Sequence, residues 1–213
     1  MDITISLITT LVLTLINGYF SMSEMALTTA KRAVLEHEAE EGDKRAERAI
    51  KLAAETPGPV YVRMGRASVP CVYEPGKELE MGRAYVLREG GDVSIVACGV
   101  EIDEALKAAE LLAAEGISAE VIDAFCVKPL DEDTILASVE KTGCIVTAEE
   151  HSVIGGLGGA VAECLAAKHP APLERVGMQD CFGTSASYEE LLVEFHMDAA
   201  AIAEAAKKAI SRK

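Results

Sequence analysis

The chain has 213 residues, of which 50% are hydrophobic, and its 20 Lys and Arg against 35 Asp and Glu give a formal net charge of −15. A nucleic-acid-binding role is excluded, because phosphate neutralisation needs clustered basic residues and no stretch of this chain supplies them. The length allows one good-sized domain, or a small domain with an appendage.

An uncharged segment runs from Ile3 to Met22, and its 20 residues would span about 30 Å as a helix, the thickness of a hydrocarbon core. We therefore predict a membrane helix within residues 1–30. Two alternatives stay open, a cleaved signal peptide and a soluble buried helix. The signal peptide is disfavoured because Asp2 stands where a basic region is expected.

Residues 31–54 are predicted to form a charged helical segment beside the membrane, interrupted near Gly42. Basic residues follow the uncharged span and none precedes it. Because basic residues beside a membrane helix favour the cytoplasmic side, we expect everything after about residue 30 to lie in the cytoplasm. These basic residues are Lys31, Arg32, Lys44, Arg45, Arg48 and Lys51.

The run NGYFSMSEMALTTAKRAVLEHEAEEGDKRAERAIKLA resembles the start of the transmembrane domain of CNNM/CorC-type magnesium transporters. The resemblance implies an ion site near Ser21, Ser23 and Glu24. The further membrane helices and nucleotide-binding modules of that family have no counterpart here, and three oxygen-bearing side chains cannot build an octahedral Mg²⁺ site alone. We expect no metal ligand in this chain, and a remnant of such a transporter stays as an alternative.

From Pro57 onward, short β-branched runs alternate with Ala- and Leu-rich helical stretches, the pattern of an α/β fold whose mainly parallel sheet carries helices on both faces. Strands are predicted at 60–62, 83–88, 93–98, 119–122, 144–148 and 173–176, with 83–88 at an edge. Helices are predicted at 101–114, 131–139, 156–167, 188–195 and 199–210. Asp131 is expected to cap the second of these helices.

Six cysteines stand apart from one another, with no C-x-x-C pair. Several lie in apolar runs, so we expect buried reduced thiols in a reducing compartment. They are Cys71, Cys98, Cys126, Cys144, Cys164 and Cys181.

The glycine-rich run from Gly155 to Gly159 fits neither G-x-G-x-x-G nor a P-loop. Close packing of a helix on the sheet is the favoured interpretation, with an anion-binding helix start left open.

Glu149, Glu150 and His151 follow a predicted strand, at the edge where open α/β sheets place ligands. A solvated strand end or a subunit contact is favoured over acid/base catalysis. The other histidines, His37, His169 and His196, have no partner pattern and are expected to be surface or packing residues.

Arg63 and Arg66 bracket a Met-Gly pair beside a predicted connector. Arginine binds phosphate or carboxylate with two parallel hydrogen bonds, so these residues are candidates for anion binding. Structural salt bridges are an equally good interpretation.

The runs GPVYVRMGRASVP, GDVSIVACGVEIDEALKAAELLAAEGISAEVIDAFCVKPLD and CIVTAEEHSVIGGLGGAVAE resemble the carboxyl-terminal part of a transketolase, especially the split type. Deoxyxylulose-phosphate synthase and pyruvate dehydrogenase beta subunits have related domains. The resemblance implies that residues 55–82 are the end of a pyrimidine-binding domain with its linker. Residues 83–213 would then be the transketolase carboxyl-terminal domain.

In that family a Gly-Asp-Gly motif binds Mg²⁺ and the diphosphate of thiamine diphosphate, and a Glu activates the cofactor. Neither the motif nor the Glu has a counterpart here. The resemblance implies no catalytic and no cofactor-binding residue in this chain, and it implies one sugar-phosphate-binding residue, Arg66. The expected partners are a second copy of the chain or an amino-terminal transketolase subunit, with sugar phosphate bound only in the complete enzyme.

We therefore expect the chain to be a carboxyl-terminal portion of a transketolase-like enzyme that is inactive alone and serves assembly. This portion is expected to be joined, within about Ala49 to Thr56, to an amino-terminal segment of the membrane type. The alternative is a membrane-tethered interaction module. In either case the α/β domain is expected in the cytoplasm, with residues 3–22 as its possible membrane anchor.

Overall fold

The computed structural model describes residues 51, 53–63, 70–74 and 77–213. The predictions for residues 1–50 lie outside these residues, and they include the membrane helix, most of the charged segment at 31–54, and the cluster of Ser21, Ser23 and Glu24. The chain divides into two compact units, Met1–Arg63 and Met64–Lys213. The sheet and its helices belong to the second unit.

Five strands form one mixed sheet in the order β1-β3-β2-β4-β5. The four strands from β3 to β5 run parallel to one another, and β1 pairs antiparallel with β3 at an edge. The strands are β1 (Tyr85–Arg88), β2 (Val93–Ala97), β3 (Ala119–Asp123), β4 (Ile145–Ser152) and β5 (Leu173–Met178). Every residue of β2 and β3 is buried, as expected for central strands covered on both faces.

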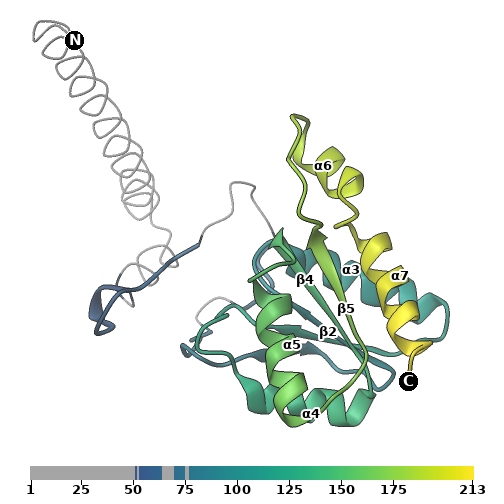
Figure 1. Ribbon diagram of the computed structural model, residues 1–213, viewed down its shortest axis with the longest axis horizontal. Helices are drawn as coiled ribbons and strands as arrows, with labels where there is room; N and C mark the ends of the chain where they lie inside the picture. Colours follow the sequence, from purple (N-terminus) through teal and green to yellow (C-terminus); the bar gives the residue numbers. More distant parts are fainter. Residues whose placement is uncertain (1–50, 52, 64–69, 75–76) are drawn as a thin grey trace, which may run out of the picture. The chain divides into compact units, whose positions relative to one another are not determined.

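Helices cover both faces of this sheet (Figure 1). On one face, α3 (Glu101–Ala114) and α7 (Ala199–Ile210) pack together over an Ala-rich core. On the other, α4 (Glu132–Thr142) and α5 (Leu157–Lys168) enclose a smaller core around Ile122 and Ile135. The predicted α/β fold with a mainly parallel sheet is confirmed.

Local sequence accounts for several helix ends. Asp131 caps α4, since its carboxylate accepts the backbone N–H of Thr134 at 3.2 Å, as predicted. The helix continues to Thr142, three residues beyond the predicted end, and stops at Gly143 in a left-handed conformation with φ 77°. Ser187 and Glu190 form a reciprocal capping box at the start of α6 (Tyr188–Glu194).

The predicted strand at 60–62 is wrong. These residues are exposed, with Tyr61 87% accessible, and the described residues offer them no neighbouring strand. Because a strand exists only when its backbone N–H and C=O groups pair with another strand, the β-branched sequence does not suffice. The prediction for 144–148 was too short, since β4 runs on to Ser152.

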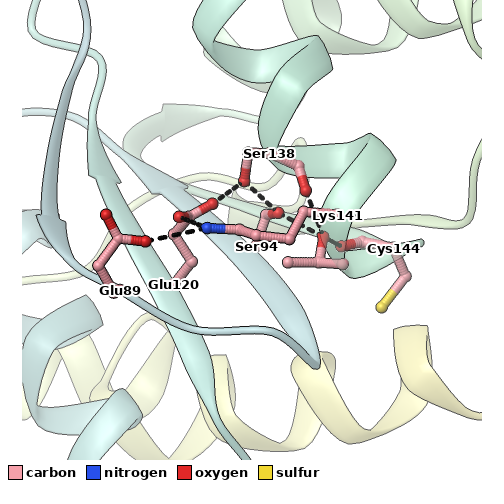
Figure 2. Close-up of polar contacts among 7 residues, drawn as sticks. Glu89, Ser94, Glu120, Ser138, Lys141 and Cys144 are labelled. Atoms are coloured by element: carbon pink, nitrogen blue, oxygen red, sulfur yellow. Dashed lines mark hydrogen bonds and ion pairs between the residues drawn. The ribbon is translucent and has the colours of Figure 1, made fainter.

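A buried polar network ties the amino ends of the strands to α4 (Figure 2). The hydroxyl of Ser94 on β2 lies 2.5 Å from that of Ser138 and 2.6 Å from that of Thr142. Ser138 donates to the buried carboxylate of Glu120 on β3, whose second oxygen contacts the ammonium of Lys141. The network therefore joins two central strands and one helix.

Replacing Lys141 with Met is expected to lower the free energy of unfolding by about 2 kcal/mol, because the carboxylate of Glu120 is buried and would lose its counterion. Urea unfolding followed by circular dichroism measures the change. The control is Lys168→Met, which removes an exposed ion pair with Glu132 and should cost less than about 0.5 kcal/mol. Equal losses in the two variants would contradict a special role for the buried carboxylate.

Candidate functional site

The carboxyl ends of the parallel strands form the edge at which a ligand site is expected. The order of the strands reverses between β2 and β4. From β2 the chain passes through α3 to β3 on one side of β2, and it later returns to form β4 on the opposite side of β2. Open α/β sheets bind ligands outside such a reversal point. Here the edge carries Glu101 after β2, Asp123 at the end of β3, and Glu149 to His151 at the end of β4.

Glu149 acts on the start of α5. Its buried carboxylate accepts the backbone N–H of Leu157 at 2.7 Å and that of Gly158 at 2.8 Å. The first amides of a helix lack partners within the helix, and its amino end carries partial positive charge, so a carboxylate is a natural counterion there. The chain itself thus supplies the anion for this helix start, which argues against the external-anion alternative.

Close approach explains two glycines of the glycine-rich run, Gly156 and Gly158. A Cβ on Gly156 would lie 2.0 Å from Oε2 of Glu149, and one on Gly158 would lie 2.9 Å from Oγ1 of Thr147. Real Cβ atoms do not come so near, so only glycine permits the carboxylate to reach the helix amides. The prediction of close helix-to-sheet packing is confirmed.

His151 is poorly placed for acid/base catalysis with Glu149. Its Nδ1 lies 2.8 Å from the carbonyl oxygen of Ser152 and 4.0 Å from Oε2 of Glu149. That Oε2 atom already accepts the amide of Leu157. Glu149 is therefore a buried helix cap, so the favoured prediction of a solvated strand end is wrong for this residue, whereas His151 is exposed. The alternative of a subunit contact stays a prediction.

Glu101 is the most unusual charged residue of the edge, and nothing in its local sequence marked it. It is 0% exposed, and neither carboxylate oxygen has a hydrogen-bond partner within the described part of the chain. Burial raises the pKa of this carboxyl to about 8, and the negative charges of Glu104, Glu150 and Asp198 raise it further. Glu101 is therefore mostly a neutral acid at pH 7.

Asp123 binds the connector that leads into the sheet. Its Oδ2 accepts the hydroxyl of Tyr73 at 2.5 Å, while Oδ1 has no hydrogen-bond partner among the described residues. Burial raises the pKa of Asp123 to about 6, and the pKa of Tyr73 is raised well above its usual range by burial and by this carboxylate. Tyr73 also packs edge-to-face on Tyr85, with ring centroids 6.1 Å apart.

Neither candidate arginine is among the described residues of the second unit. Arg66, the predicted sugar-phosphate residue, lies outside the described residues, and the exposed Arg63 belongs to the other unit. Within the described residues, no group of three or more His, Cys, Asp or Glu side chains could hold a metal ion. His169 is half-buried and His196 exposed, while His37 lies outside the described residues.

All six cysteines are described, and no disulfide joins them. Cys144 and Cys164 are buried as expected. Cys71 and Cys181 are exposed, so the prediction of buried thiols is wrong for these two. Both lie in loops, where the apolar-strand pattern that supported the prediction does not apply.

Two family models match the chain. The model described as "Transketolase, C-terminal domain" matches residues 82–202, more than half of the sequence. The model described as "Cyclin M transmembrane N-terminal domain" matches residues 7–58. No helix within the described residues is both long and apolar enough to cross a membrane.

Curated relatives match the same carboxyl-terminal part. A 6-deoxy-6-sulfo-D-fructose transketolase subunit from a Clostridium species is 49% identical over 156 residues, 73% of this chain and 48% of that protein. An apulose-4-phosphate transketolase subunit from Phocaeicola vulgatus is 37% identical over 164 residues, 76% of this chain and 52% of that protein. The chain thus spans about half the length of these relatives.

A solved structure described as a split gene transketolase, inactive beta4 tetramer, superposes with a TM-score of 0.76 at 47% sequence identity. The superposition covers 79% of this chain and 55% of that one. Fold and sequence therefore point to the same group of proteins.

Proposed function

The chain belongs to the transketolase carboxyl-terminal domain family through residues 82–202, and from this premise we propose that it is an assembly part of a transketolase-type enzyme with no turnover of its own. The complete enzyme would transfer a two-carbon ketol unit between sugar phosphates. This chain would contribute contact surface, together with Arg66 as a ligand of the sugar phosphate.

One observation carries this proposal. The match occupies 73% of this chain but only 48% of the Clostridium relative, so about half of that protein has no counterpart in the matched region. The family resemblance places the cofactor-activating Glu in the part that precedes the match. In this chain that position is taken by the segment matching the cyclin M model.

The residues at the sheet edge support the same proposal. Thiamine diphosphate needs an anion-binding site and a metal site, but the amides that open α5 are engaged by Glu149 and the described residues contain no metal-binding group. Asp123 is bonded to Tyr73, and Glu101 is enclosed by the fold. These contacts support the proposal that other domains of the complete enzyme hold the cofactor.

The experiment is to mix the full chain with a ketose phosphate, an aldose phosphate, thiamine diphosphate and Mg²⁺, and to follow formation of the new ketose phosphate. We expect no turnover by the chain alone, beside an active two-domain transketolase as the positive control. Adding separately expressed thiamine- and pyrimidine-binding domains of a related enzyme tests assembly by co-purification. Turnover without any added domain would overturn the proposal.

A second function, a membrane-tethered interaction module facing the cytoplasm, is favoured by the match of residues 7–58 to a transmembrane family model. In this case residues 3–22 would anchor the chain, and the proposed boundaries would be 1–30, 31–54, 55–82 and 83–213. Membrane fractions that keep the chain through high salt and alkaline wash would support it. Release of the chain under these conditions would exclude it.

A further inference from the structure

The segment between β5 and α7 begins and ends with a residue in a strained backbone conformation. Asp180 and His196 both have φ 54°, and among the described residues they are the only non-glycine residues with positive φ. A residue with a Cβ rarely occupies this left-handed region, so each position stores backbone strain. A change of φ at these two positions would move the segment between them and release the strain, so both are candidate hinges.

The segment between the two hinges has few anchors. Figure 1 shows α6 and the loop before it projecting beyond the carboxyl ends of β4 and β5. Residues 181–187 are all exposed, and Leu192 is the one buried residue of α6. Tyr188 and Phe195 are only partly buried where they pack against the larger core. Segments with so little buried apolar surface open locally more easily than the elements of a core.

One of these anchors, Tyr188, lies beside the buried carboxyl of Glu101. Burial raises the pKa of the Tyr188 hydroxyl to about 12, and the nearby negative charge of Glu101 raises it further. Neither carboxylate oxygen of Glu101 has a hydrogen-bond partner in the described part of the chain, and no basic side chain described there forms an ion pair with it. A carboxyl in such surroundings is stable only as the neutral acid.

The groups that face Glu101 from the neighbouring elements are mostly acidic. They are Glu104 of α3, Glu150 of β4, Asp198 before α7 and Tyr188 of α6. The ammonium of Lys107 on α3 is already engaged, since it lies 2.8 Å from Oδ2 of Asp103 and 2.7 Å from Oε1 of Glu104. An ionised Glu101 would therefore be repelled by its neighbours unless water could reach it.

We propose that residues 180–196 form a lid that opens about Asp180 and His196, and that Glu101 releases a proton when the lid opens. In the closed state the carboxyl keeps its O–H bond. In the open state this bond breaks, the proton passes to water and the carboxylate is hydrated. The open lid would expose acidic groups at the carboxyl edge of the sheet. This inference goes beyond the proposed assembly function and does not depend on it.

The direction of the pH dependence follows from the two states of Glu101. In the closed state its pKa is raised to about 8 by burial and by its acidic neighbours, whereas hydration in the open state returns it toward the usual 4.5. The open state therefore binds fewer protons between these two values. Opening is favoured as the pH rises from about 4.5 to 8, and the effect levels off above 8.

Hydrogen–deuterium exchange of the full chain in a mild non-ionic detergent, at about pH 6 and about pH 8, tests this coupling. After correction for intrinsic exchange rates, the amides of residues 188–197 should be less protected than those of α4 at both pH values, because the lid opens without global unfolding. Protection of the lid should fall about tenfold or more from the lower to the higher pH.

Two glutamine variants connect the fall to one carboxyl. Glu101→Gln has no proton to release, so protection of the lid should no longer depend on pH. Glu110→Gln, at an exposed position on the same helix, should keep the fall seen in the wild type.

Leu192→Ala tests whether α6 anchors the lid. Removing most of its one buried side chain should lower protection of the lid about tenfold or more at either pH, while the ratio between the two pH values stays the same because Glu101 is unchanged. The matched control is Val193→Ala, which shortens a side chain that is 60% exposed on the same helix and should leave protection unchanged.

Three results would overturn the lid. Lid amides as well protected as those of α4 would show that the segment does not open by itself. Lid protection in the wild type that is independent of pH, or a fall that persists in Glu101→Gln, would show that opening is not coupled to Glu101. The turnover and co-purification experiments judge the proposed function separately.

Discussion

The free energy of unfolding of Glu101→Gln, relative to that of the wild type, is expected to be roughly 2–4 kcal/mol higher at pH 9 than at pH 4.5. The folded-state pKa of Glu101 is raised to about 8 from a usual value of 4.5. A carboxyl with a raised folded-state pKa favours the folded protein in its neutral form, so stability is lost as the pH rises from about 4.5 to 8. Glutamine cannot ionise and escapes this loss.

Urea unfolding of both proteins at the two pH values measures this effect, because the difference between pH values removes any pH-independent cost of the amide. The control is Glu110→Gln, an exposed position on the same helix, which should leave the pH profile unchanged. Parallel pH profiles for the wild type and Glu101→Gln would show that folding does not raise the pKa of Glu101.

Replacing Gly156 with alanine is expected to lower the free energy of unfolding by about 2–4 kcal/mol. The added Cβ would lie 2.0 Å from Oε2 of Glu149, so either the carboxylate leaves the amides of α5 or the helix moves away from the sheet. Both outcomes leave buried polar groups without partners.

Gly159→Ala is the matched comparison for Gly156→Ala. A Cβ on Gly159 meets nothing within 4 Å, and alanine favours a helix more than glycine, so this variant should gain up to about 1 kcal/mol. Thermal unfolding of the two variants should therefore shift in opposite directions. A gain in both would show that Glu149 does not require the glycine.

Local patterns allowed most elements of the second unit to be predicted from sequence. Both ends of the helix at Ala199–Ile210 were predicted correctly, and so was the role of Asp131 as a helix cap. Helix periodicity and capping depend on residues within one or two turns, so they can be read from local sequence. The predicted strand at 60–62 failed for the complementary reason, since pairing depends on another strand.

The candidate site was predicted only in part. The sequence placed Glu149, Glu150 and His151 at a strand end, but it did not show that Glu149 caps a helix that starts eight residues later. Glu101 and the bond between Tyr73 and Asp123 were missed entirely. Burial of a carboxyl is a property of what surrounds it, and the groups around Glu101 come from β4 and the start of α7 as well as from its own helix.

The sequence by itself determined the fold class, the edge position of the first strand and membership of the transketolase carboxyl-terminal family, because these are written in local periodicity and in shared residues. Only the tertiary structure decided which charged groups are buried and what they contact. The carboxyl ends of separate strands meet at one edge only after the sheet has formed, and there the fold turns Glu149 into a helix cap and Glu101 into a neutral acid.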